Sequence, residues 1–348
     1  MKQAVMTEPG KIRFQEVPVP EIRDNEVLVK VMSIGVCGSD IHVYHGKHPY
    51  TPYPVVQGHE VSCEVVKAGS AVSGFRKGEK VTIEPQVSCG TCYACRNGLY
   101  NICDSLKVLG FQTTGTASDY FAVPAAKLVR LPATLPHDEG AMIEPLAVGV
   151  RAVKQAGDIR GKKVLVFGAG PIGNLVAQTA RGMGAAKVMI TDLNDFRLEK
   201  ARTCGVELTV NPKNTPLEEA VVEAFGAYER ADVIFECVGV NATMESAIQI
   251  ARKGTPIVVV GVFGEKACLD MARVNENELK LLGTARYVIE DFEEAKRLVE
   301  SGAVKLGPLV TDVFSFDRYD DAYRKIEKEP ATTMKVIVRV NEKGAADE

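Results

Sequence analysis

The chain has 348 residues, of which 46% are hydrophobic and 25% are charged, and its formal net charge is −3. This length predicts two domains, since a globular domain holds roughly 150 residues. The near balance of charges argues against nucleic acid or an anionic membrane surface as a partner, because such partners require clustered excess Lys and Arg.

The start of the chain, from Met1 to Met6, alternates like a strand and contains no apolar secretory core. No apolar run approaches the ~18 residues that span a bilayer. We therefore expect a cytoplasmic protein without a membrane partner. In that reducing compartment the nine cysteines are expected to be thiols or metal ligands rather than disulfides.

Short strand-like runs fill the chain before Ala141. Examples are residues 26–31, 60–67 and 80–83, in a segment punctuated by Gly, Pro and Ser. Such runs are too short and too often interrupted for helices. They predict an all-β, barrel-like domain.

After Ala141 the pattern changes to apolar runs that alternate with helical segments. The predicted strands are 163–167, 187–191, 231–236, 257–261 and 279–284, and the predicted helices include 144–155, a segment from the Gly-rich turn to about 183, and 196–204. Near-continuous Val and Ile runs between helices indicate a parallel sheet that is covered on both faces.

The last part of the chain has an amphipathic helix at 291–301 and a strand at 335–340. We expect it to join the first segment in one domain. The predicted division is therefore a β-rich domain of residues 1–148 and 285–348, with an α/β domain of residues 149–284 between them.

A Gly-rich turn follows the predicted strand 163–167 and opens a helix; its key residues are Gly168, Gly170, Pro171, Ile172 and Gly173. Glycines at these positions allow a tight turn and close approach of the backbone to a pyrophosphate, which the helix N-terminus attracts. Asp192 ends the next strand, where a carboxylate can bind ribose hydroxyls and repel a 2′-phosphate. The alternative is that Asp192 is a helix N-cap or a solvated strand end. Arg197 could meet a 2′-phosphate, but Asp192 favours NAD over NADP.

Three more residues are predicted to contact NAD because ligands bind at the carboxyl ends of parallel strands. These are Val238 and Gly239, through their backbone, and Val262. Glu236 ends the preceding strand and could serve packing alone.

Four cysteines occur within one loop: Cys89, Cys92, Cys95 and Cys103. Four thiolates at short spacing can close a tetrahedral shell, which is typical of a structural zinc site. Chance clustering or a redox Cys-x-x-Cys pair are the alternatives, but a redox pair leaves two cysteines unexplained. We predict one structural zinc ion.

A dispersed set, Cys37, His59, Glu60 and Glu144, combines a thiol, an imidazole and carboxyl groups. Catalytic zinc takes such mixed ligands and keeps one position open. From residue chemistry alone, His59 and Glu60 could equally form a buried polar pair, and Cys37 could pack as a small hydrophobic side chain.

Over essentially the whole chain these motifs resemble the zinc-containing medium-chain dehydrogenase/reductase superfamily. The shared motifs are Cys37-Gly-Ser-Asp-Ile-His42, Gly58-His-Glu60, the four-cysteine loop, the Gly-rich turn and Asp192. The resemblance implies a GroES-like catalytic domain with two zinc ions, an inserted Rossmann domain that binds NAD, and a homodimer or homotetramer. The sorbitol (polyol) dehydrogenase branch is the most similar, through Ile143-Glu-Pro-Leu146 and Gly283-Thr-Ala-Arg-Tyr287.

The resemblance also implies residue roles. It makes Cys37, His59 and Glu60 ligands of the catalytic zinc ion, and Glu144 a carboxylate that holds the zinc-bound water or replaces a ligand. Ser39 and His42 are implied as a proton relay. Arg286 and Tyr287 are implied to line the polyol pocket, and Tyr44 and Phe111 lie near two other pocket positions. The loops 45–53 and 112–118 do not align with the branch, so the substrate is less defined than the chemistry.

The expected function is NAD-linked, zinc-dependent oxidation of a secondary alcohol on a polyol or sugar acid. The first alternative is a sugar-acid 5-dehydrogenase acting on idonate, galactonate or gulonate, followed by a threonine or butanediol dehydrogenase. An alternative of another class is a non-catalytic dinucleotide-binding protein, which would be expected to lose the zinc ligands or the relay.

Overall fold

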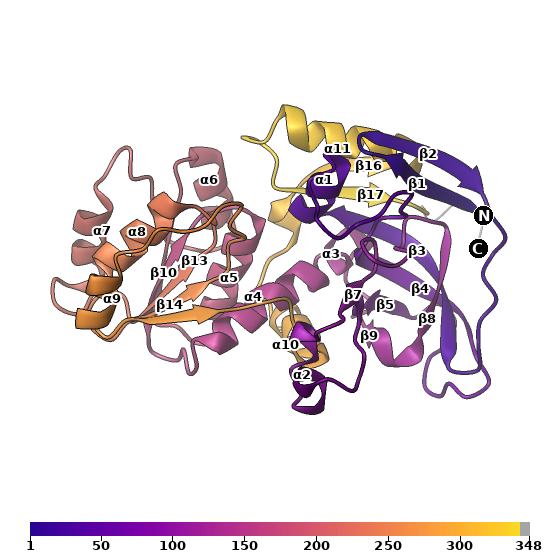
Figure 1. The fold of residues 1–348 in the computed structure, drawn as a ribbon, viewed down its shortest axis with the longest axis horizontal. Helices are drawn as coiled ribbons and strands as arrows, with labels where there is room; N and C mark the ends of the chain where they lie inside the picture. The colour runs from indigo at the N-terminus through magenta and orange to yellow at the C-terminus, as the bar shows by residue number, and fades with distance from the viewer. Residues whose placement is uncertain (342–348) are drawn as a thin grey trace. The chain divides into compact units, whose positions relative to one another are not determined.

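The computed structural model describes residues 1–341, which group into two compact units (Figure 1). The first unit contains Met1–Glu144, Val288–Lys296 and the chain from Val310; the second contains Pro145–Tyr287 and Arg297–Leu309. Among the described residues, no helix is long and apolar enough to cross a membrane.

The main sheet of the first unit joins strands from both ends of the chain. Its order is β16 (Val310–Ser315), β17 (Lys335–Arg339), β3 (Glu26–Val36), β4 (Glu60–Ala68), β5 (Lys80–Ile83) and β9 (Leu128–Arg130), and β8 (Tyr120–Pro124) pairs with β3. All of these ladders are antiparallel except β16–β17. The C-terminal strand β17 thus lies beside β3 (Figure 1).

Smaller elements complete this unit. The two further strand pairs are β1 (Lys2–Glu8) with β2 (Lys11–Glu16), and β6 (Gln86–Val87) with β7 (Lys107–Val108). Its helical elements are α1 (Gly38–Tyr44), α2 (Tyr93–Arg96), η1 (Tyr100–Ile102), η2 (Ala125–Lys127), α3 (His137–Gly140), η4 (Phe316–Arg318) and α11 (Tyr319–Lys328). Alternate residues of β3 and β4 form a core with the rings of Tyr44, Tyr319 and Tyr323 from α1 and α11.

The second unit is built on a six-stranded parallel sheet. Its order is β12 (Leu208–Val210), β11 (Lys187–Thr191), β10 (Lys163–Phe167), β13 (Val233–Glu236), β14 (Pro256–Val259) and β15 (Lys280–Gly283). The strand order reverses between β10 and β13, so ligands are expected at their carboxyl ends.

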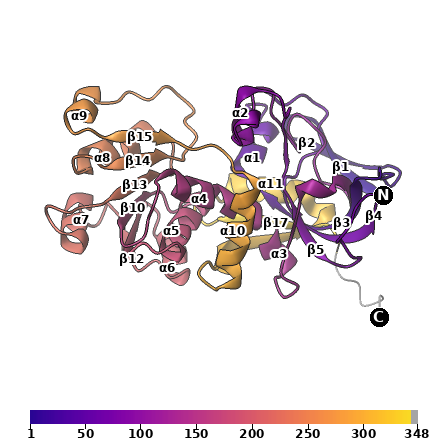
Figure 2. The same ribbon diagram turned by 90° about the horizontal axis from the view of Figure 1, so that it is seen from below.

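Helices cover both faces of this sheet, because successive strand residues point to opposite sides. Val164 and Val166 pack against α5 (Pro171–Gly182) and α6 (Asp195–Thr203), whereas Leu165 packs against α7 (Leu217–Phe225) and α8 (Asn241–Ile250). Figure 2 shows α5 and α6 on one side of the strands and α8 on the other. The remaining helical elements of this unit are α9 (Met271–Glu276) and η3 (Gly307–Leu309). Helices α4 (Ile143–Gln155) and α10 (Ile289–Glu300) each have residues in both units.

The predicted fold class, a β-rich part with a doubly wound parallel sheet, is confirmed. Strands β10 and β11 have the predicted bounds, and β13, β14 and β15 differ from the predicted bounds by no more than two residues. Helices α1, α7, α8 and α11 and the short strand β12 were not predicted. Helix α1 has 7 residues and β12 has 3, which are too few to show a period, and α11 is mostly charged, so its apolar stripe is narrow.

Candidate active site

Two strands and a helix bring Cys37, His59 and Glu60 together. Cys37 is the N-cap residue of α1, and Glu60 is the first residue of β4. One donor atom from each side chain lies within 4.8 Å of the other two. The dispersed donors that the resemblance indicated thus converge in the structure.

The β3–β4 register explains how Glu60 reaches this position. It places Glu60 opposite Gly35. A Cβ atom added at Gly35 would lie 2.1 Å from Glu60 Oε2, so any side chain there would displace the carboxylate. Glycine at position 35 therefore provides the space that Glu60 occupies.

The surroundings of His59 suit a cation. His59 is buried, and its Nδ1 atom has no hydrogen-bond partner, although Asp40 Oδ1 lies 3.5 Å away. Burial disfavours the protonated ring, but Asp40, Cys37 and Glu144 outweigh it and hold the pKa of His59 well above its ordinary value. Buried anionic groups that favour positive charge, with sulfur, nitrogen and oxygen donors, fit a catalytic zinc ion.

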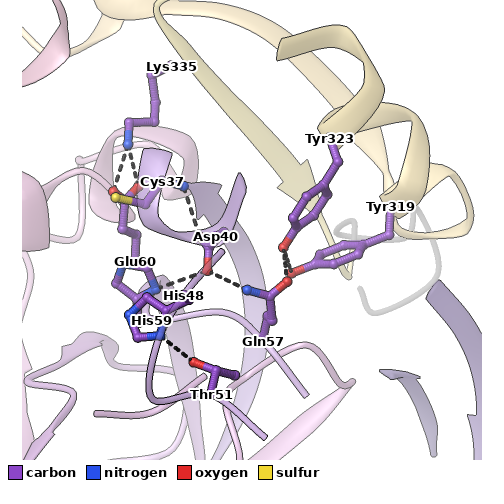
Figure 3. Close-up of polar contacts among 10 residues, drawn as sticks. All are labelled: Cys37, Asp40, His48, Thr51, Gln57, His59, Glu60, Tyr319, Tyr323 and Lys335. Atoms are coloured by element: carbon purple, nitrogen blue, oxygen red, sulfur yellow. Dashed lines mark hydrogen bonds and ion pairs between the residues drawn. The ribbon is translucent and has the colours of Figure 1, made fainter. Parts of the chain in front are cut away.

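Asp40 supports this group and was missed in the sequence. Its Oδ2 accepts the Cys37 N–H at 2.9 Å, and its Oδ1 accepts the side-chain N–H of Gln57 at 3.1 Å (Figure 3). Outer carboxylates of this kind orient metal-binding imidazoles. The signal was the position of Asp40 three residues after Cys37, at a helix N-terminus.

Lys335 is the second residue that the sequence did not reveal. Its Nζ atom contacts Glu60 Oε1 at 2.7 Å and Oε2 at 2.6 Å, and both side chains are buried. Burial lowers the pKa of Lys335, but the negative charges of Glu60, Cys37 and Glu144 outweigh that effect and raise it. The buried ammonium group is therefore a charged partner of Glu60 inside the protein.

The other predicted residues of this site, Glu144, Ser39 and His42, lie in helices α4 and α1. Glu144 begins the first turn of α4, is buried, and lies near enough to His59 to raise its pKa. Ser39 and His42 share α1 at a spacing of three residues, which places them on one side of the helix. Ser39 is half-buried and His42 is exposed.

Phe111 and Tyr44, which the resemblance placed near the pocket, differ in their surroundings. The Phe111 ring lies 5.1 Å from the His59 ring, between centroids, and 4.9 Å from the His48 ring. Tyr44 instead turns into the core, where its hydroxyl donates to Asp320 at 2.9 Å. Of these two residues, only Phe111 lies beside Cys37, His59 and Glu60, which we call the metal-donor group.

The four cysteines of the predicted structural site also converge, with one sulfur each and all sulfurs within 4.8 Å. Amide and hydroxyl donors of Thr91 and the amide of Cys92 lower the pKa of Cys89 to about 5. Burial, followed by hydrogen bonds to Cys92 and Cys103, raises the pKa of Cys95 to about 12. A cation would relieve the cost of thiolates so close together, so the set fits a tetrahedral metal ion.

The dinucleotide motif has the geometry that its sequence predicts. A Cβ atom at Gly173 would lie 1.8 Å from the carbonyl oxygen of Gly168, so only glycine allows this turn. Asp192 Oδ2 accepts the amide of Ala169 at 2.7 Å, and Oδ1 accepts the amide of Asn194 at 2.9 Å. The N-cap of α6 is Asn194, so the alternative role of Asp192 as that cap is wrong.

Arg197, Val238 and Gly239 were predicted to contact the dinucleotide, and each already has a partner in the structure. Arg197 lies 3.8 Å from Asp192 Oδ2. The amides of Val238 and Gly239 both donate to Glu236, at 2.9 and 3.0 Å, so their contacts with a dinucleotide are left to carbonyl oxygens and side chains. The Glu236 carboxylate thus stabilises the turn after β13.

Val262, Arg286 and Tyr287 belong to the second unit. Val262 is 84% exposed, and Tyr287 is buried. Arg286 has a φ of 52°, which is unusual for a residue with a side chain. Their roles toward NAD and substrate remain predictions.

Comparison with family models identifies both parts of the chain. Residues 23–133 match the alcohol dehydrogenase GroES-like domain, and residues 171–301 match the zinc-binding dehydrogenase family. The chain is 36% identical over 333 residues to sorbitol dehydrogenase 1 of Saccharomyces cerevisiae, covering 92% of each protein. The chain belongs to the zinc-containing medium-chain dehydrogenase/reductase superfamily. It is an oxidoreductase of the sorbitol dehydrogenase-like branch, as the resemblance predicted.

Other members of this superfamily extend the comparison. The 2-dehydro-3-deoxy-L-galactonate 5-dehydrogenase of Pseudoalteromonas atlantica is 37% identical over 317 residues, with 91% of this chain and 92% of that protein covered. Among solved structures, an Escherichia coli CFT073 alcohol dehydrogenase complexed with NADH has a TM-score of 0.89 at 30% identity, over 98% and 99% of the two chains. A putative zinc-binding dehydrogenase of Sinorhizobium meliloti 1021 bound to NADP has a TM-score of 0.88 at 32% identity, over 97% and 99%.

Proposed function

We propose that this dehydrogenase oxidises a secondary alcohol of a polyol or sugar acid to a ketone, reversibly, with NAD as hydride acceptor. The observation that carries the proposal is the convergence of Cys37, His59 and Glu60, whose mixed donors suit a zinc ion with an open position. When bound, zinc acts as a Lewis acid that lowers the pKa of an alcohol oxygen. The relatives that act on sorbitol and on a sugar acid support this substrate class.

The chain's own side chains would do the remaining work. Ser39 would accept the alcohol proton and pass it to His42, whose exposure lets it exchange that proton with water. Glu144 would hold the water that the substrate replaces. Arg286 would donate to adjacent hydroxyls or a carboxylate through its planar fork, and Tyr287 would line the same pocket.

We also propose two zinc ions per subunit, the second held by Cys89, Cys92, Cys95 and Cys103, where it would order a loop with little apolar content. NAD is preferred to NADP because the Asp192 carboxylate would repel a 2′-phosphate. The domains of residues 1–148 with 285–348 and of residues 149–284 are proposed as catalytic and cofactor-binding, in a cytoplasmic homodimer or homotetramer.

A sugar-acid 5-dehydrogenase is the second candidate, since one relative at 37% identity carries that activity in its name. The two candidates differ in whether the pocket must pair a carboxylate. Arg286 could serve either, so the sequence and the fold leave both open.

The test is NADH formation with a panel of sorbitol, xylitol, idonate, galactonate, gulonate, threonine and 2,3-butanediol. Each compound is run with NAD and NADP, on the zinc-loaded enzyme, after chelation, and after zinc is restored. Zinc-dependent turnover of a polyhydroxy compound with NAD supports the proposal and names the substrate. Turnover of threonine or butanediol alone, or no turnover by enzyme with full zinc content, overturns it.

A further inference from the structure

A buried chain of two hydrogen bonds and one ion pair runs from α11 to His59 (Figure 3). Tyr323, in α11, donates its hydroxyl hydrogen to Gln57 Oε1 at 3.0 Å. Gln57 in turn donates through Nε2 to Asp40 Oδ1 at 3.1 Å. Asp40 Oδ1 lies 3.5 Å from His59 Nδ1.

Each member of this chain is sealed from solvent. Tyr323 is 0% exposed, Gln57 is 2% exposed and Asp40 is 1% exposed. A buried polar group without a partner is costly, so buried chains of this kind favour one arrangement. Burial also raises the pKa of Tyr323 well above its ordinary value, which keeps its hydroxyl protonated and able to donate.

The directions of the hydrogen bonds follow from the chemistry of the groups. The carboxylate of Asp40 can only accept, so the NH₂ end of Gln57 must face it. The oxygen end of Gln57 then faces Tyr323, whose hydroxyl satisfies it. Tyr323 therefore holds the amide in the orientation in which its NH₂ group donates to Asp40.

The position of Asp40 Oδ1 beside His59 Nδ1 has a consequence for the metal. An acceptor oxygen there favours the ring form with hydrogen on Nδ1, which leaves the Nε2 lone pair available for a metal ion. The sequence separation between Gln57 and Tyr323 is 266 residues, so the segment after the Rossmann domain acts on a ligand near the N-terminus.

We propose that Gln57 and Tyr323 are positioning residues of the catalytic zinc site, which act on His59 through Asp40. The proposal rests on the proposed function only in taking His59 as a zinc ligand. Loss of an outer-shell hydrogen bond at such sites typically weakens metal binding by 10–100-fold. Without the hydrogen bond from Gln57, Asp40 is expected to hold the His59 ring less firmly, and zinc is expected to dissociate faster.

The experiment measures zinc release from the full-length, zinc-loaded protein into a chromogenic chelator. Cys37→Ser identifies the release phase of the catalytic site, because it removes one donor there. The phase from the four-cysteine loop serves as an internal reference within the same molecule. Zinc release does not depend on any substrate, so a failed substrate panel leaves this measurement interpretable.

Gln57→Met is expected to speed release from the catalytic site by about 10-fold, and Tyr323→Phe to speed it in the same phase by a smaller factor. Tyr319→Phe is the matched control. Its hydroxyl is in the same helix, is also buried and accepts a long hydrogen bond of 3.4 Å from the Tyr323 hydroxyl, whereas Tyr323 itself donates to Gln57 at 3.0 Å. This variant is expected to release zinc at the parent rate.

The double variant Gln57→Met/Tyr323→Phe separates positioning from general destabilisation. If Tyr323 acts through Gln57, it adds no further change in the release rate once Gln57 is replaced. Changes that add in the double variant, a parent rate in Tyr323→Phe, or equal acceleration of both release phases would overturn the proposal. Cobalt-substituted protein supplies a second readout, since its visible spectrum is expected to change in Gln57→Met and to stay constant in Tyr319→Phe.

Discussion

Lys335 contacts both carboxylate oxygens of Glu60, at 2.7 and 2.6 Å, from the opposite side of strand β3. Strand β3 lies between β17, which carries Lys335, and β4, which carries Glu60. Gly35 of β3 has no side chain to separate them. Gly35 in the central strand β3 thus leaves room for Lys335 to reach Glu60 and neutralise its carboxylate.

Replacement of Lys335 by Met is expected to destabilise the zinc-free protein more than the zinc-loaded protein. Removing one partner of a buried ion pair leaves an unpaired charge and costs about 3–5 kcal/mol. A bound zinc ion would compensate Glu60 in place of the ammonium group. Thermal unfolding of the parent and of Lys335→Met, each with zinc and after chelation, measures this difference.

Lys335→Arg is the control, because it keeps a positive charge within reach of Glu60. It is expected to behave more like the parent than Lys335→Met does. Equal losses of stability in the presence and absence of zinc would show that Lys335 supports the fold without any link to the metal.

Gly35→Ala is expected to remove the catalytic zinc ion while the structural ion stays. The new methyl group would overlap Glu60 Oε2, and the carboxylate would have to leave its place. Overpacking of this kind typically costs about 1–3 kcal/mol, so the protein should still fold. Zinc content per chain is the measurement, and it should fall by one ion together with activity.

Gly38→Ala provides the comparison from the same motif. A Cβ atom at Gly38 meets nothing within 4 Å. That variant should retain its full zinc content. If both alanine variants lose the same amount of zinc, the space above Gly35 is not what places Glu60.

The sequence predicted those features whose residues are close together in the chain. The Gly-rich turn and the four-cysteine loop are local, so spacing alone identified them. Cys37, His59 and Glu60 are dispersed, and residue chemistry left a metal site and a buried polar pair equally open; only the resemblance favoured the metal. The β3–β4 register then brings them together.

Residues that act across the fold gave no such signal. Lys335 is 275 residues from Glu60 and starts a strand that is apolar only at Val336–Val338, and a lysine at a strand end is normally exposed to solvent. Asp40 lay inside a recognised motif, but its function depends on Gln57 and Tyr323, which no period or spacing connects to it. Strand pairing and helix packing create these contacts, so they become visible only in three dimensions.

Glu84 supplies a prediction about pH and stability. Burial raises its pKa above the ordinary value of 4.5, against the opposing effects of Lys127 and Gln86. A carboxyl group with a raised folded pKa favours folding below its unfolded pKa, and this contribution is lost as pH rises through the folded value. Glutamine does not titrate, so Glu84→Gln should gain stability relative to the parent as pH rises from about 5 to about 8.

The measurement is the difference in unfolding temperature between Glu84→Gln and the parent across that range. The Lys127 ammonium group, which contacts Glu84, loses its partner in the variant, so the variant can be less stable at every pH. The direction of the change with pH is what tests the prediction. A difference that stays constant or moves in favour of the parent contradicts it.

Asp192 is expected to determine the preference for NAD over NADP. It has two effects, on the shape of the Gly-rich turn and on the charge near the ribose, and replacing Asp192 changes both. Its oxygens accept the amides of Ala169 and Asn194, so it fixes the Gly-rich turn as well as presenting a negative charge. Asparagine removes the charge and can satisfy only one of those two amides. Asp192→Asn should therefore raise the KM for NAD and also reduce the repulsion of a 2′-phosphate.

The NAD-to-NADP ratio of kcat/KM separates these effects. It should fall by about 10- to 100-fold in Asp192→Asn, as expected when a hydrogen bond to a charged group worth about 1.5–3 kcal/mol is lost with one cofactor only. Arg197 lies 3.8 Å from Asp192, so Arg197→Leu in the same background should reduce NADP use again. If Asp192→Asn raises the KM of both cofactors equally and leaves the ratio unchanged, Asp192 shapes the turn and does not select the cofactor.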